Sequence, residues 1–256
     1  MLKIGLKIWS TNLQYIPIAR ELFKRRVFDY IELFTVPGSI GTLSSWKQLA
    51  VPYILHAPHS TAGLNPSDAA CREKNIELAR EVEQFFYGLM PWLVIFHPGV
   101  NGRLSESMDQ FKSFGKNFPA MYDKVVIENK PLIGLNNETC LGASPEEVKR
   151  LLEGTKRGFC LDFNHAICYS VCAGKDWKNV LAEFMELKPS MYHLCDGFFS
   201  VKDDHEHLGA GEFDLPYLIK LIDKDKPVSL ETKKDSSDFL EDFVLDVKKL
   251  REYAGV

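Results

Sequence analysis

Short apolar segments rich in β-branched residues alternate with longer amphipathic segments along the whole chain. Segments of this kind, four to eight residues long, are typical of strands that are buried on both faces of a parallel sheet. The pattern predicts eight strands, at residues 3–8, 28–34, 52–56, 93–97, 124–128, 157–162, 190–194 and 228–232.

The longer segments between these strands predict helices. In residues 69–88, Ile76, Ala79, Val82 and Phe86 follow helical spacing and fall on one side. Ser144 followed by Pro145 is a typical helix start, with a capping hydroxyl and a proline at the first helical position. The clearest helices are expected at residues 16–25, 69–88, 145–153, 177–187 and 239–253.

Eight βα units in 256 residues predict an α/β protein, a single (β/α)8 TIM barrel domain over residues 1–256. An open doubly wound sheet is the alternative, because periodicity alone does not show that a sheet closes. No linker, charge block or low-complexity stretch divides the chain.

Composition narrows the class of protein only slightly. The chain is 45% hydrophobic and 26% charged, with a formal net charge of −4, so it offers no broad basic face to nucleic acid or to an anionic membrane. No apolar run is long enough to span a bilayer. The six cysteines form no CxxC pair and no secretory signal is visible, which predicts reduced thiols and a cytoplasmic location. Cys168 and Cys172 are interpreted as packing residues rather than a redox or metal pair.

Histidines and carboxylates fall at the ends of the predicted strands. His56, His97, Glu128, Asp162 and Glu231 each end a strand. In a parallel barrel these ends open on one face, so the side chains should converge there with four more: His165, His193, Asp203 and His205. So many carboxylates would repel one another unless a cation lay between them. His and carboxylate ligands suit Zn²⁺ or Mn²⁺, which predicts a cluster of divalent ions.

The order of these motifs resembles that of the xylose-isomerase-like barrels. The resemblance is closest to the endonuclease IV branch, the family-2 apurinic/apyrimidinic endonucleases, and it spans residues 56 to 231. The motifs that carry it are His56-Ala-Pro, Phe96-His97-Pro-Gly99, Ile127-Glu128-Asn129, Gly158-Phe-Cys-Leu-Asp162-Phe-Asn-His165, His193-Leu-Cys-Asp196, Asp203-Asp-His205-Glu-His207-Leu-Gly209-Ala-Gly211 and Leu230-Glu231-Thr232.

This resemblance implies a metal-dependent phosphodiester hydrolase, acting on abasic DNA or a smaller phosphoester. Up to three Zn²⁺ ions, or Mn²⁺, would be held, with Glu128 and Glu231 as the catalytic carboxylates. The three implied ligand groups are His56, His97 and Glu128; Glu128, Asp162, His193 and Glu231; and His165, Asp203 and His205.

A sugar or sugar-phosphate isomerase or epimerase of the same superfamily is the alternative. In such enzymes two Glu, one Asp and one His hold a single metal ion, and the matching residues here are Glu128, Asp162, His193 and Glu231. The two Glu would exchange protons with the substrate. That enzyme would not need His56, His97, Asp203 and His205 as ligands, so their presence favours the hydrolase. A barrel that binds a ligand without catalysis is a third hypothesis, and the complete ligand set argues against it.

The chain departs from the endonuclease pattern in three loops. Gly5-Leu-Lys-Ile-Trp9-Ser10 replaces a Gly-Ala-His-Val-Ser motif, and Cys195-Asp196-Gly197-Phe198 replaces an Asn-Asp-Ser/Ala-Lys motif. His59-Ser60-Thr61-Ala62 replaces a Tyr-Leu-Ile-Asn segment of the DNA-recognition loop. The metal ligands are therefore expected to be retained, while the loops that read DNA are not.

Several further residues have two interpretations. Glu32 resembles a strand carboxylate of the sugar isomerases, or pairs with a nearby lysine or arginine. His59 is expected to face the substrate, and His207 to be solvated or to support a ligand. The aromatic residues either stack on the substrate or fill the rim; they are Trp9, Phe34, Phe163, Phe198 and Phe199. Four lysines either bind phosphate or are solvated; they are Lys130, Lys202, Lys233 and Lys234.

Overall fold

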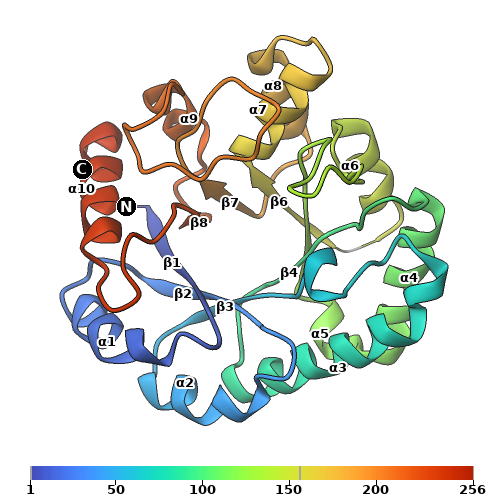
Figure 1. The fold of residues 1–256 in the computed structure, drawn as a ribbon, viewed down its shortest axis with the longest axis horizontal. Coiled ribbons are helices and arrows are strands. Elements are labelled where there is room, and N and C mark those ends of the chain that lie inside the picture. The colour runs from blue at the N-terminus through green and yellow to red at the C-terminus, as the bar shows by residue number, and fades with distance from the viewer. Residues whose placement is uncertain (1, 156, 256) are drawn as a thin grey trace.

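Parallel strands close into a barrel at the centre of the molecule, and helices surround them (Figure 1). The computed structural model describes residues 2–155 and 157–255. Each strand pairs with the next, and β1 pairs with β8 through Lys3–Pro227 and the residues that follow. The strands are β1 (Lys3–Trp9), β2 (Tyr30–Phe34), β3 (Tyr53–His56), β4 (Val94–Phe96), β5 (Val125–Glu128), β6 (Gly158–Asp162), β7 (Met191–Leu194) and β8 (Pro227–Leu230).

The predicted single-domain (β/α)8 barrel is confirmed, and the open sheet is wrong. The strand positions agree with those expected, with small differences at the ends. β2 begins at Tyr30 rather than at Phe28, and β8 ends at Leu230, so Glu231 lies one residue beyond the strand. His97 likewise follows β4 directly.

The five predicted helices are present, and further helices complete the outer layer. Residues 69–88 divide into a 3-10 turn at Ala69–Cys71 and the helix α3. Within the described residues no helix is both long and apolar enough to cross a membrane. The helices are α1 (Ile16–Lys24), α2 (Leu43–Leu49), α3 (Arg72–Leu89), α4 (Leu104–Asn117), α5 (Pro119–Tyr122), α6 (Pro145–Leu152), α7 (Phe163–Cys172), α8 (Trp177–Glu186), α9 (Leu215–Leu221) and α10 (Glu241–Ala254).

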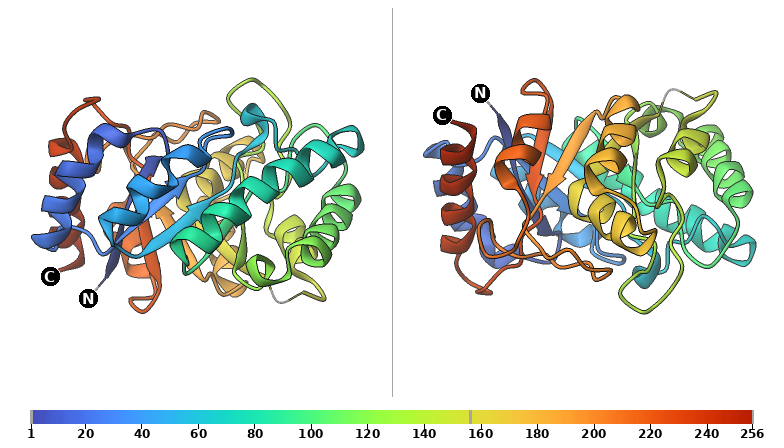
Figure 2. Two further views of the ribbon diagram at one scale, coloured as in Figure 1. Left: turned by 90° about the horizontal axis from the view of Figure 1, so that it is seen from below. Right: turned by 90° about the horizontal axis from the view of Figure 1, so that it is seen from above.

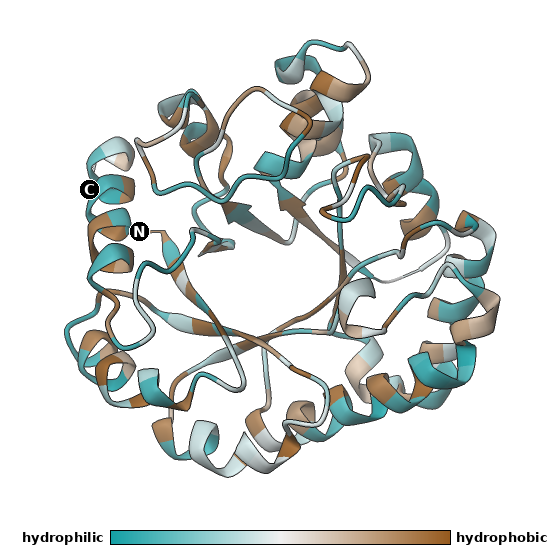
Figure 3. Ribbon diagram, in the orientation of Figure 1, coloured by the Kyte–Doolittle hydropathy of each residue, from teal (hydrophilic) through white to brown (hydrophobic). Residues whose placement is uncertain are grey.

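The helices turn hydrophobic residues towards the strands and hydrophilic residues outwards (Figure 3). The side views show the helices lying along the outside of the barrel, with the two chain ends close together beside α10 (Figure 2). Capping follows the sequence: Ser144 accepts a hydrogen bond from the amide of Glu147, and Pro145 occupies the first turn of α6.

The interior of the barrel has an apolar floor. Side chains alternate between the two faces of a strand, so Ile4, Leu6 and Ile8 of β1 pack outwards in the main core. The inward positions form a separate cluster beneath the mouth: Tyr30, Ile54, Ile95, Val126, Cys160 and Met191. This floor closes the barrel from below and keeps water out of it.

Two residues further along each strand, every inward position carries an ionisable side chain. Each of these eight residues lies on one strand or directly after it. Together they form a ring above the floor, at the open carboxyl end of the barrel, and we call it the mouth ring. Its members are Lys7, Glu32, His56, His97, Glu128, Asp162, His193 and Glu231. The strand period of two therefore places an ionisable layer directly on an apolar one.

Gly5 provides the room that this floor needs. A Cβ at Gly5 would overlap the ring of Tyr30, and the Tyr30 hydroxyl is fixed by a 2.9 Å hydrogen bond to the hydroxyl of Ser229. We expect Gly5→Ala to reduce the free energy of unfolding by about 1–3 kcal/mol, because the buried ring cannot move aside without strain. Urea denaturation should show this as a lower midpoint. The control is Gly41→Ala, where nothing lies within 4 Å of the added Cβ, and equal midpoints for the two variants would contradict the account.

Candidate metal centre

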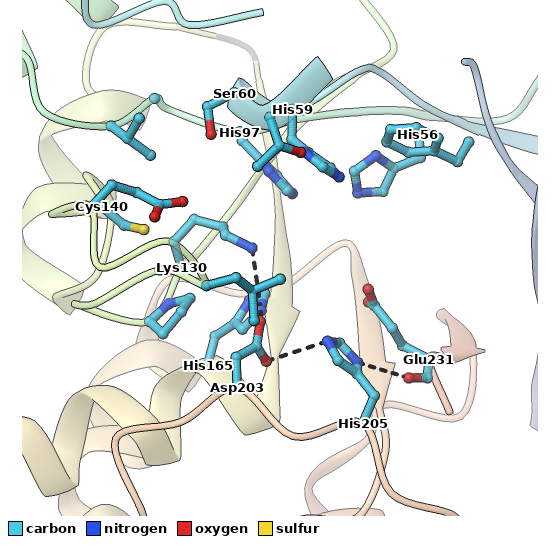
Figure 4. A pocket seen from close by; sticks show the side chains of 18 of the residues that line it. His56, His59, Ser60, His97, Lys130, Cys140, His165, Asp203, His205 and Glu231 are labelled. Carbon is cyan, nitrogen blue, oxygen red and sulfur yellow. Dashed lines mark hydrogen bonds and ion pairs between the residues drawn. The ribbon is translucent and has the colours of Figure 1, made fainter. Parts of the chain in front are cut away.

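The mouth ring and three side chains from following segments converge on one cluster. Figure 4 shows His56, His97 and Glu231 of the ring near those three, His165, Asp203 and His205. Glu32, His56, Glu128, Asp162 and His193 are each 0–1% exposed. His165 joins them from the first turn of α7, and Asp203 and His205 join from the loop after β7. The structure thus brings together all nine residues that the sequence proposes as ligands.

His56 and His97 both direct an imidazole nitrogen at one oxygen of Glu128. Each Nε2 lies 3.1 Å from Glu128 Oε2. The Nδ1 of His56 donates to the carbonyl of Ala57 at 2.8 Å, which leaves its Nε2 without a proton in the neutral ring. A bare nitrogen facing a carboxylate oxygen is unfavourable unless a proton or a metal ion lies between them.

His193 has the same arrangement in the second group. Its Nε2 donates to Glu32 Oε2 at 2.9 Å, and its Nδ1 faces Glu231 Oε2 at 2.8 Å and Glu128 Oε2 at 3.5 Å. Asp162 Oδ2 lies 3.7 Å from the same nitrogen. Three buried atoms of this group have no hydrogen-bond partner within the described residues: Asp162 Oδ2, His193 Nδ1 and Glu231 Oε2. Buried polar atoms are normally paired, so this group fits a missing cation.

His165, Asp203 and His205 form a third, looser group. Asp203 faces His165 Nε2 with one oxygen at 3.2 Å and His205 Nε2 with the other at 3.4 Å. The opposite nitrogens donate to backbone carbonyls, His165 to Asn129 and His205 to Glu231. The ammonium of Lys130 lies 3.3 Å from His165 Nε2, so the protein already supplies one positive charge here.

Within the first group, and separately within the second, the donor atoms lie within 4.8 Å of one another. Each of these two groups is therefore close enough to hold a metal ion. Within the described residues the third group does not reach this closeness. Cys160 lies near Glu128 and His193, but burial raises the pKa of its thiol to about 12, so the thiol is protonated at neutral pH.

The electrostatics show a site short of positive charge. Burial and the neighbouring carboxylates of Glu231 and Glu128 raise the pKa of Asp162. Burial works against protonation of the histidines, yet Asp162 and Asp203 raise the pKa of His165 to about 10. Asp203 raises the pKa of His205 to about 9 in the same way. In the absence of metal, protons therefore supply charge that divalent ions would supply when bound.

Neighbouring side chains hold these residues in place. Asn129 joins β5 to β6 by accepting from the amide of Asp162 and donating to its carbonyl. Asp162 Oδ1 caps α7 by accepting from the amide of His165, which leaves Oδ2 facing the cluster. Asn164 donates to Asp203 Oδ1 at 2.8 Å. Hydrogen bonds thus fix the positions of several candidate ligands.

Lys7 is the member of the mouth ring that the sequence interpretation did not propose. Its ammonium lies 2.6 Å from Glu231 Oε1 and 3.3 Å from Glu32 Oε1. Burial opposes its charge, but these carboxylates raise its pKa above the ordinary value. The signal in the sequence was a single lysine inside the apolar strand Ile4-Gly-Leu-Lys7-Ile8, two residues beyond a glycine. Glu32 pairs with this lysine, as one of its two interpretations expects.

The two remaining histidines, His59 and His207, are not among the candidate ligands. His59 packs on Phe34 and His97, with ring centroids 5.0 and 5.8 Å apart, and its side chain lines the cavity. His207 pairs with Asp246 and Asp235 outside the ring. His59 therefore faces the place where a substrate would lie, and His207 does not.

Some of the aromatic residues considered for stacking on a substrate line the cavity, and others do not. Trp9 and Phe34 line the cavity, and Trp9 is 55% exposed. Phe163 is fully buried and stacks on Tyr192 in the core, so the expectation that it could reach a substrate is wrong. Phe198 and Phe199 lie on the surface, and Phe199 packs on Trp177.

The four lysines interpreted either as a phosphate-binding rim or as solvated residues do not share one environment. Lys130 lines the cavity, where Glu128 and Asp203 raise its pKa against the effect of burial. Lys202 pairs with Asp204, and Lys233 pairs with Glu206 at the surface. The cavity above the cluster has a volume of about 190 Å³, with Lys7, Trp9, His59, Lys130 and Cys140 in its wall.

Comparison with known proteins places this chain among related barrels. The family model described as "Xylose isomerase-like TIM barrel" matches residues 28–253. A probable endonuclease 4 from Mycoplasma mobile is 30% identical over 211 residues, which cover 73% of this chain and 71% of that protein. Endonuclease IV from Thermus thermophilus has a TM-score of 0.75 at 20% identity, covering 99% of both chains. A D-tagatose 3-epimerase-like protein has the same TM-score at 21% identity, covering 99% of this chain and 97% of the other.

The contact of Glu32 with His193 gives a first test of the metal centre. We expect Glu32→Gln to weaken zinc binding by about 10–100-fold, because a neutral amide oxygen accepts from His193 Nε2 more weakly than the carboxylate and no longer increases the basicity of the ring. Competition with a chromogenic chelator measures the affinity. Glu183→Gln on the exposed face of α8 is the control. Unchanged zinc affinity in Glu32→Gln would show that His193 does not hold an ion.

Proposed function

This chain belongs to the xylose isomerase-like TIM barrel family, and we propose that it is a metal-dependent phosphodiester hydrolase resembling endonuclease IV. A one-metal enzyme needs only four ligands, here Glu128, Asp162, His193 and Glu231. The observation that carries the proposal is that further metal-binding side chains lie beside these four. His56, His97, Asp203 and His205 all face the same buried cluster as the second group.

The residues present fit two closely held divalent ions and a third, weaker one. Glu128 would bridge the first two groups, since His56, His97 and His193 all approach its Oε2. Nitrogen and carboxylate donors favour Zn²⁺, with Mn²⁺ as the alternative. Bound there, such ions would acidify a water and neutralise the charge of a phosphodiester.

The chain's own residues supply orientation, exclusion of water and proton transfer. The apolar floor beneath the mouth ring prevents water from entering from below. The Glu231 side chain is 18% exposed, whereas the Glu128 side chain is 1% exposed, so Glu231 can exchange a proton with an attacking water. Lys7 holds Glu231 Oε1 and leaves Oε2 facing the cluster. Lys130 lines the opposite wall and is placed to bind a phosphate oxygen.

The wall of the cavity favours an accessible phosphoester over a buried position in an intact duplex. In place of the aromatic residue of the DNA-recognition loop stands His59, which packs against His97 instead of projecting outwards. Abasic DNA remains within the proposal, as does a smaller diester.

A second candidate function is epimerisation or isomerisation of a sugar or sugar phosphate. The specific observation that favours it is the closeness of Glu128, Asp162, His193 and Glu231, which suffice for one ion. Glu128 and Glu231 come from β5 and the end of β8, and could exchange protons with opposite faces of a substrate. The similarity to a D-tagatose 3-epimerase-like protein supports this candidate.

Hydrolysis of bis(p-nitrophenyl) phosphate and of an abasic-site duplex by the zinc-loaded protein tests the first proposal. We expect Glu128→Gln and His165→Gln to lower the rate at least about 100-fold, because each removes a donor to an ion. His207→Gln is the matched control, since His207 pairs with Asp246 outside the cluster.

The alternative makes opposite predictions in the same variants. If the chain is an epimerase, His165→Gln keeps its activity and Mn²⁺-loaded protein interconverts ketohexoses at C3. Turnover of a ketohexose together with no cleavage of either phosphodiester would contradict the hydrolase.

A further inference from the structure

A second cavity of about 480 Å³ lies beside the metal centre, where β1 and β8 end. It shares Lys7, Trp9, His205 and Glu231 with the cavity above the cluster, so these residues separate two neighbouring compartments. Figure 4 shows His205 and Glu231 side by side at this boundary. The remaining wall, which defines what we call the β8 cavity, includes Asn12, Tyr15, Thr232, Lys233 and Lys234.

The β8 cavity carries charge of the opposite sign to the cluster. Its wall contains Lys7, Lys233 and Lys234 and one carboxylate, Glu231. Lys7 pairs with Glu231 and Lys233 pairs with Glu206, each at 2.6 Å, so Lys234 is the lysine of this wall that remains for an anion. Lys234 donates to the carbonyl of Thr232 at 2.6 Å, and residues 2–155 and 157–255 offer it no carboxylate within 4 Å. Burial lowers the pKa of Lys234 although Asp242 and Asp246 act in the opposite direction, and a bound anion would stabilise its charged form.

Thr232 gives a second and independent indication of a ligand. The residue is 5% exposed and lines the β8 cavity, and its Oγ1 has no hydrogen-bond partner within the described chain. Buried hydroxyls are normally paired. Thr232 and Lys234 lie two residues apart on the short segment after β8, and both line this cavity, so one anionic group can satisfy both. Loops after the seventh and eighth strands of such barrels frequently bind phosphate.

Trp9 offers a flat apolar surface at the boundary between the two cavities. The indole is 55% exposed, and its backbone amide is held by Asn12 Oδ1 at 2.8 Å. It leans on Phe34, with ring centroids 5.8 Å apart. Exposed aromatic side chains beside a basic groove are the usual platforms on which nucleic-acid bases stack.

We propose that the β8 cavity binds the nucleotide adjoining the scissile phosphodiester, with its base on Trp9 and its phosphate between Lys234 and Thr232. A cavity of this volume is within the range that encloses a ligand of nucleotide size. The inference rests on the proposed hydrolase only in placing the scissile bond at the cluster. The opposite charges of the two compartments then explain how one substrate is oriented: its reacting phosphate meets the ions, and its neighbouring phosphate meets lysine.

Binding of thymidine 5′-monophosphate to the full chain after removal of metal tests this inference. Without metal, the acidic cluster repels phosphate, so binding reports on the β8 cavity alone. By isothermal titration calorimetry we expect thymidine and ribose 5-phosphate each to bind at least about fivefold more weakly than the nucleotide, since each lacks one of the two contacts.

Variants assign the two contacts. Lys234→Met and Trp9→Leu should each weaken nucleotide binding at least about fivefold. Lys234→Arg should keep it, as should the controls Lys112→Met on α4 and Trp92→Leu, which line neither cavity. Thermal melting of each variant shows whether it is folded, and the conservative arginine variant keeps the lysine test valid.

Three results would overturn the inference. These are no nucleotide binding, binding that Lys234→Met and Trp9→Leu leave unchanged, and ribose 5-phosphate binding as tightly as the nucleotide, which indicates a sugar phosphate. Failure of the hydrolase proposal is a separate result, because it appears as absent cleavage of bis(p-nitrophenyl) phosphate by the zinc-loaded protein. Nucleotide binding without metal does not depend on that activity.

Discussion

Repulsion among buried carboxylates is the constraint on which the rest of this site depends. Glu32, Glu128 and Asp162 are buried in one mouth, and Asp203 and Glu231 lie at its edge. Lys7 and Lys130 offset part of their charge. Such an arrangement is stable only if cations or protons lie between the oxygens. The barrel makes the arrangement rigid, because the strand period fixes each side chain above an apolar floor that cannot relax around it. Two oxygens and one nitrogen of the second group have no hydrogen-bond partner among the described residues, as expected where a cation is missing.

The convergence of the candidate ligands could be predicted from the sequence because strand ends are easy to recognise. His56, Glu128 and Asp162 each end an apolar run, and a parallel barrel has only one face on which such ends can meet. Residues whose role depends on three-dimensional neighbours could not be assigned in this way. Lys7 is an ordinary strand residue until the structure shows two carboxylates within 3.3 Å. Phe163 follows a ligand directly, but it begins α7 and therefore turns into the core.

The candidate ligands and the cavity walls lie on different parts of the chain. The two groups around Glu128 lie on strands or directly after them, at positions that the barrel fixes. The walls that would contact a substrate lie on loops, and they include His59, Lys130 and Lys234, which are not candidate metal ligands. A barrel can keep its reaction while its loops change the molecule on which it acts. The acidic cluster and the β8 cavity together fit our proposal of a substrate with more than one phosphate.

The central claim is that the mouth ring and its neighbours form a multinuclear metal centre. Anomalous diffraction at the zinc absorption edge, from crystals grown with zinc, tests it most directly. The account predicts two strong peaks on either side of Glu128, one beside His56 and His97 and one beside His193 and Glu231, and a weaker peak between His165 and His205. A single peak at the second group would contradict the multinuclear centre and support the one-metal epimerase. The absence of any peak in the mouth would contradict the metal centre itself.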